Sequence, residues 1–63
     1  MAKLLAIGTT VEVPNDYLEG VVTNNRETMP DLARRFDYTV LIDLGDGERV
    51  EWGYAGSELR EKG

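Results

Sequence analysis

Apolar and polar residues alternate in several short segments of the chain, which is the pattern of half-buried β-strands. Residues 9–13 and 18–23 are rich in β-branched residues and are predicted to be strands. The clearest strand is predicted over residues 38–44, where one face carries Tyr38, Val40, Ile42 and Leu44. Leu41 interrupts the polar face of this strand, and we expect it either to cover a second small apolar cluster or to face a partner.

Glycine and proline separate the predicted strands. Pro14 and the residues after it end the first strand, and Gly45-Asp46-Gly47 predicts a tight hairpin turn between strands 38–44 and 48–52. Gly20 lies inside the second strand, which indicates a bulge or a sharp bend. Residues 57–60 suit a 3₁₀ turn before a last short strand. The predicted core consists of Val40, Ile42, Val50 and Leu59.

One segment has a helical pattern. Thr28 and Asp31 have the spacing of a capping box, and apolar residues follow at helical intervals. We therefore predict a short helical turn from Met29 to Arg35, inserted before the third strand. Arg34 and Arg35 would then lie near its C-terminal end, where cations are favoured.

The order of these elements resembles that of the SH3-like small β-barrels. The residues that carry the resemblance are Ile7-Gly8-x-x-Val11-x-Val13, Glu19-Gly20-Val21-Val22, Tyr38-x-Val40-x-Ile42, Gly45-Asp46-Gly47, Val50-x-Trp52 and Ser57-Glu58-Leu59. The resemblance covers nearly the whole chain. It implies an all-β fold, a five-stranded SH3-like barrel forming a single domain over residues 1–63.

Two families with this layout resemble the chain in more detail. One is the type II dihydrofolate reductase, in which four short chains form a pore and a Val-Gln-Ile-Tyr stretch binds folate and the nicotinamide cofactor. Here the matching stretch is Val50-Glu51-Trp52-Gly53, so Glu51 and Gly53 replace two of the binding residues, and the reductase activity is not expected. The other is the photosystem I E-subunit barrel, a docking module. Tudor, chromo and KOW modules share the pattern more loosely.

Composition excludes several chemistries. The 63 residues include no cysteine and no histidine, which removes disulfides, thiolate nucleophiles, Ser-His catalysis and the usual zinc sites. We expect no catalytic residues, no metal and no cofactor. The net charge of −5 disfavours bulk attraction to nucleic acid or to an anionic membrane. No apolar run is long enough for a membrane span, and residues 1–7 do not resemble a secretory signal, so a cytoplasmic location is expected.

The aromatic and arginine residues are the best candidates for a binding surface, because these types often supply binding hot spots. Tyr38 and Trp52 continue apolar strand faces, which favours the core for both. The alternative is a partly exposed Trp52 beside exposed Tyr17 and Tyr54. The arginines could equally balance carboxylates on a solvated surface. The predicted binding residues are Tyr17, Trp52, Tyr54, Arg34 and Arg35.

Three functions remain open from the sequence. The first is a non-catalytic protein-interaction module, an accessory subunit or small regulator of the kind that phages and mobile elements encode. The second is a nucleic-acid-associated barrel that uses Arg26, Arg34, Arg35 and Tyr54. The third is a homo-oligomer whose central pore binds a small molecule. The first is preferred because the chain has no catalytic set of residues and an acidic composition.

Overall fold

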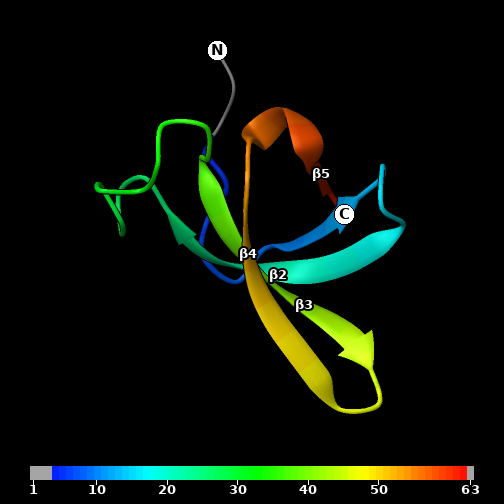
Figure 1. Ribbon diagram of the computed structural model, residues 1–63. Helices are drawn as coiled ribbons and strands as arrows, with labels where there is room; N and C mark the ends of the chain where they lie inside the picture. Colours follow the sequence, from blue (N-terminus) through cyan, green and yellow to red (C-terminus); the bar gives the residue numbers. More distant parts are fainter. Residues whose placement is uncertain (1–3, 63) are drawn as a thin grey trace.

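Five antiparallel strands form one sheet in the computed structural model, which describes residues 4–62 (Figure 1). The order across the sheet is β4-β3-β2-β1-β5, so β4 and β5 are its edges. A 3₁₀ turn, η1, connects these two edge strands. The elements are β1 (Thr10–Val13), β2 (Leu18–Asn25), β3 (Tyr38–Gly45), β4 (Glu48–Tyr54), η1 (Gly56–Glu58) and β5 (Arg60–Glu61). The all-β prediction and its strand order along the chain are thus confirmed, while the hydrogen-bonded sheet itself is open rather than closed.

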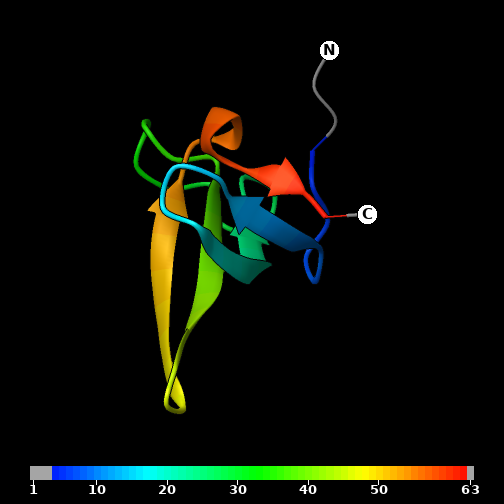
Figure 2. The same ribbon diagram turned by 90° about the vertical axis from the view of Figure 1, so that its right-hand side faces the viewer.

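The core lies on one side of the sheet, which we call the inner face. Its fully buried side chains are Val11, Val13, Val22, Val40 and Ile42. Val50 and Leu59 are partly buried and pack against this cluster, so the predicted core is largely correct. Leu44 is 42% exposed although it follows Ile42 by two residues. The reason is that the β3–β4 hairpin extends beyond the other strands, which leaves its tip uncovered (Figures 1 and 2).

Gly20 allows β2 to pass close to β3. It is buried opposite Ile42, and a Cβ atom at Gly20 would lie 2.5 Å from the carbonyl oxygen of Leu41 and 2.7 Å from the Val40 side chain. The expected irregularity in β2 is a register shift between Val22 and Asn24 instead. Gly20 is therefore required by the close approach of two strands, not by a bulge at its own position.

The predicted helical turn from Met29 to Arg35 is wrong. Residues 26–37 form isolated turns, and no helix occurs between β2 and β3. Asn25, rather than Thr28, caps the first of these turns: its side-chain Oδ1 accepts hydrogen bonds from the backbone N–H groups of Glu27 and Thr28, at 2.9 and 3.1 Å.

The side chain of Arg26 holds the loop in its non-helical path. Its guanidinium donates hydrogen bonds to the carbonyl oxygens of Leu32, Ala33, Arg34 and Phe36, and it lies 3.6 Å from the Asp37 carboxylate. These carbonyl groups lie at the end of the predicted segment, where a helix leaves its last carbonyl oxygens without a backbone partner. The Thr28 hydroxyl, the expected helix cap, instead accepts a hydrogen bond from the Asn25 N–H at 3.0 Å. Two backbone hydrogen bonds of the loop, from Leu32 to Met29 and from Phe36 to Ala33, span three residues instead of the four of an α-helix.

Candidate interaction surfaces

Tyr54 is a core residue, which contradicts its prediction as an exposed binding residue. It is 6% exposed and lies directly opposite Tyr38, which is also buried. The expectation failed because β4 continues to Tyr54, whereas the strand predicted from the sequence ends at residue 52. Strand alternation then directs the Tyr54 side chain to the same face as Val50.

The burial of Tyr54 raises the pKa of its phenol above the ordinary value of 10.0, and the carboxylates of Asp16 and Glu58 raise it further. In the unfolded chain this phenol loses its proton near pH 10, so the native state holds the proton to higher pH. The contribution of Tyr54 to the free energy of unfolding is therefore fully present below pH about 10 and is lost as pH rises through the native pKa.

We expect Tyr54→Phe to reduce the loss of stability above pH about 10, because phenylalanine has no proton to release. The measurement is urea unfolding of both proteins between neutral and strongly alkaline pH. Tyr17→Phe is the control, since Tyr17 is 95% exposed and should leave the alkaline slope unchanged. Equal slopes for wild type and Tyr54→Phe would contradict the assignment.

The other predicted binding residues are exposed but do not form one surface. Tyr17 in the β1–β2 turn is 95% exposed, and Trp52 on the edge strand β4 is 44% exposed. Arg34 and Arg35 are exposed in the loop between β2 and β3, where the Arg35 guanidinium lies 4.7 Å from the centroid of the Phe36 ring. Figure 1 places that loop and the β1–β2 turn on opposite sides of the molecule.

The residues named for nucleic-acid binding do not form one exposed surface either. The Arg26 guanidinium is occupied by loop carbonyl oxygens, and Tyr54 is buried. Arg34 and Arg35 are the two members of that set that remain exposed.

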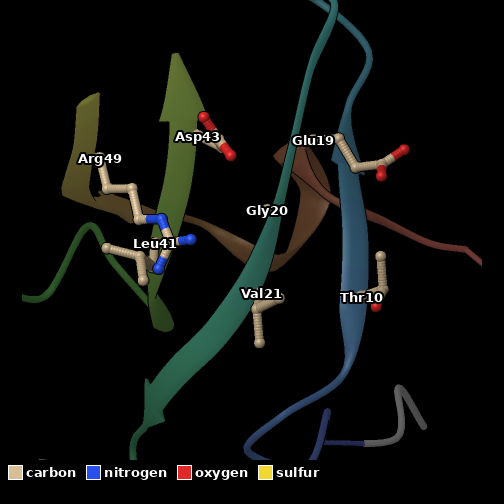
Figure 3. A pocket seen from close by; sticks show the side chains of 7 residues that line it. All are labelled: Thr10, Glu19, Gly20, Val21, Leu41, Asp43 and Arg49. Carbon is tan, nitrogen blue, oxygen red and sulfur yellow. The ribbon is translucent and has the colours of Figure 1, made fainter. Parts of the chain in front are cut away.

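A shallow hollow of about 360 Å³ lies on the outer face of the sheet, opposite the core. Val21 and Leu41 face each other across β2 and β3 and form its apolar floor; Val21 is 39% exposed. Gly20 lines the hollow through its backbone, because a side chain at this position would point to the core side, against Val40 and Ile42. The residues that line it are Thr10, Glu19, Gly20, Val21, Leu41, Asp43 and Arg49 (Figure 3).

Charges of both signs border this outer-face hollow. Glu19 forms an ion pair with Lys62, and the Asp43 carboxylate accepts a hydrogen bond from the backbone N–H of Gly45 at 2.9 Å. Arg49 reaches from β4 in the direction of Leu41 and forms no ion pair within residues 4–62 (Figure 3). The hollow therefore combines an apolar floor with a polar rim.

A second hollow of about 300 Å³ adjoins the first and shares Glu19 with it. Tyr17, Pro14 and Leu18 contribute apolar surface there, and the Arg60–Glu12 ion pair, at 3.5 Å, borders it. Together the two hollows connect Leu41 to Tyr17. The sequence singled out Leu41 and Tyr17 separately, but it could not show that Val21 lies beside Leu41, because 20 residues separate them in the chain.

The described residues offer no metal site or membrane-spanning helix. No three of their carboxylates gather in a way that could hold a metal ion. Likewise, no helix within residues 4–62 is long and apolar enough to cross a membrane.

Comparison of the chain with models of protein families, with curated proteins and with solved structures gives no match.

Proposed function

We propose that this protein is a non-catalytic interaction module, an accessory subunit or small regulator that binds an extended segment of a protein partner in the cytoplasm. We further propose that its fold belongs to the SH3-like barrels. The strand order β4-β3-β2-β1-β5, together with the 3₁₀ turn between β4 and β5, supports that assignment.

The observation that carries the proposal is the apolar floor made by Val21 and Leu41 on the outer face. Core packing does not require apolar residues on this face, because the core lies on the inner face. A partner side chain placed on the floor would remove both residues from water, at about 25 cal/mol for each Å² of apolar surface buried. Binding of this kind requires a few fixed apolar anchors and no catalytic group.

The shape and charge of the two adjoining hollows favour an extended peptide over a nucleic acid. They run from Leu41 to Tyr17, so a strand-like segment could place an apolar side chain on the floor and a second one against Tyr17. The carboxylates of Glu19 and Asp43 border the path and would repel phosphate groups.

The test compares two leucine variants. Leu41→Gln removes half of the floor, whereas Leu44→Gln changes a leucine that is 42% exposed at the tip of the β3–β4 hairpin and outside the hollow. A partner is captured from native lysate, and its affinity for each purified variant is measured by calorimetry at two salt concentrations.

We expect Leu41→Gln to lower the affinity for the partner at least about tenfold, which corresponds to a loss of about 1.4 kcal/mol of binding free energy. Leu44→Gln is expected to keep the wild-type affinity. Circular dichroism confirms that both variants are folded. Equal affinity of folded Leu41→Gln and wild type would exclude the hollow as the site. A captured nucleic acid whose binding falls steeply with salt would contradict the proposed class of partner.

A further inference from the structure

The outer edge of β4 is a free strand edge. β4 pairs only with β3, and it spans seven residues, from Glu48 to Tyr54. The other edge strand, β5, has only two residues, and its Arg60 pairs with Glu12 of the neighbouring strand. Among residues 4–62, β4 therefore offers the longer row of unpaired backbone groups.

The residues that point outward from β4 can be derived from the hydrogen bonds of Val22. Its N–H donates to the Thr9 carbonyl oxygen at 3.0 Å, and its carbonyl oxygen accepts from the Gly8 N–H at 2.8 Å. Both groups thus point away from β3. Backbone groups in an antiparallel sheet alternate between the two neighbouring strands, so Val40, opposite Val22, directs its own groups to β4.

The same alternation continues into β4. Val40 pairs with Trp52 and Ile42 pairs with Val50, so Trp52 and Val50 direct their backbone groups to β3. The residues between them, Arg49, Glu51 and Gly53, direct their N–H and carbonyl groups outward. None of these residues is a proline, so each can donate its backbone N–H to a second strand. The charges of Arg49 and Glu51 protect the edge only against a pairing that sets like charges opposite each other.

The charges on β4 select one pairing with a second copy. In an antiparallel pair centred on Val50, Arg49 of each chain lies opposite Glu51 of the partner subunit, and both are outward-facing residues that can exchange backbone hydrogen bonds. A pair centred on Glu51 would instead set two glutamates against each other. Arg49 has no ion pair within residues 4–62, and the hydrogen bonds to Glu51 use only its Oε2 atom.

This arrangement also suits the rest of the hairpin. The acidic turns, each with Asp46, would lie at opposite ends of the paired strands, about 27 Å apart, which exceeds the screening length of about 8 Å at physiological salt. On the inner face, Trp52, which is 44% exposed, would come diagonal to Val50 of the partner subunit, within reach of an aromatic side chain. A 63-residue domain gains from such burial, because a domain this small buries only about 60% of its unfolded surface.

We infer that two copies of this chain pair through their β4 edges, about a two-fold axis at Val50, with reciprocal contacts between Arg49 and Glu51. The pairing leaves the floor formed by Val21 and Leu41 uncovered, but Arg49 also borders the outer-face hollow, so Leu41→Gln and not the Arg49 variant separates the two proposals.

The experiment is a charge swap measured by sedimentation equilibrium over a wide range of protein concentration, without any other partner. We expect wild type to be a dimer at high concentration. Arg49→Glu and Glu51→Arg are each expected to raise the dissociation constant about tenfold or more, because each sets like charges opposite each other twice. The double variant with both changes is expected to restore the dimer.

Two controls accompany the swap. Arg34→Glu changes the net charge as Arg49→Glu does, at an exposed loop residue, and is expected to keep the wild-type dissociation constant. Leu41→Gln is expected to keep the dimer, so that failure of this inference and failure of the proposed function are distinguished. The fluorescence of Trp52, the single tryptophan, is expected to shift as the dimer is diluted.

A monomeric wild type at high concentration would overturn the inference. Growth beyond a dimer would also overturn it, since pairing of β4 with β5 of the next chain is open-ended or forms rings. A dimer that survives both single variants, or that the double variant fails to restore, would place the interface elsewhere.

Discussion

Ile42→Ala is expected to lower the free energy of unfolding by about 2–5 kcal/mol, the usual cost of removing a large buried aliphatic side chain. Ile42 is completely buried and lies opposite Gly20 in β2 and Val50 in β4, at the centre of the sheet. The lost side chain leaves a cavity that strands hydrogen-bonded on both sides cannot close. Domains are stable by only about 5–15 kcal/mol, so a domain this small could be substantially unfolded by the change.

Urea unfolding followed by circular dichroism measures this loss. Val21→Ala is the matched control: it removes aliphatic carbons from the neighbouring strand, but on the outer face, where Val21 is 39% exposed. We expect that control to cost less than about 1 kcal/mol. A larger cost for Val21→Ala than for Ile42→Ala would mean that the inner and outer faces are assigned the wrong way round.

Gly20→Ala is expected to destabilise the fold by about 1–3 kcal/mol, as overpacking of a tight core does. The added Cβ would lie 2.5 Å from the carbonyl oxygen of Leu41. That atom belongs to a central strand, so it can move only if β2 and β3 separate. The change would also disturb the floor of the outer-face hollow, since the displaced oxygen belongs to Leu41, which forms the floor with its pairing partner Val21.

Gly56→Ala is the control for this substitution. Its Cβ would lie 3.4 Å from the Asp37 carboxylate, an ordinary contact, and Gly56 does not have a positive φ angle. Thermal unfolding of the two variants should therefore show a clear loss for Gly20→Ala and a small change for Gly56→Ala. Similar losses of stability for both variants would mean that replacing any glycine destabilises this fold. The close approach of β2 and β3 would then not be the reason for the effect at Gly20.

The sequence pattern predicted correctly those parts of the fold that depend on interactions between residues close together in the chain. The alternation in residues 38–44 and the Gly45-Asp46-Gly47 turn gave the β3–β4 hairpin, because strand faces and tight turns are encoded within a few residues. The helical turn was predicted wrongly because the Thr28 hydroxyl, its expected cap, bonds to Asn25, and because Arg26, outside the segment, holds the loop in another path. No local pattern reports such a contact.

The candidate site was predictable only in pieces, for a related reason. The exposure of Tyr17 follows from its place in a turn, and Leu41 was visible as an apolar residue on a polar face. Their relation through Val21 depends on strand pairing between distant residues. Tyr54 was misplaced because the end of a strand is set by its partner: pairing with Tyr38 extends β4 past Gly53.

The way Arg26 organises residues 26–37 bears on how this protein can change over evolution or be engineered. The acceptors for its guanidinium are backbone carbonyl oxygens, which every amino acid supplies. Exposed loop positions such as Asp31, Ala33 and Arg34 can therefore vary in sequence while one arginine preserves the path of the chain. The loop is therefore suited to displaying new side chains, because substitutions at its exposed positions should change the stability of the sheet little.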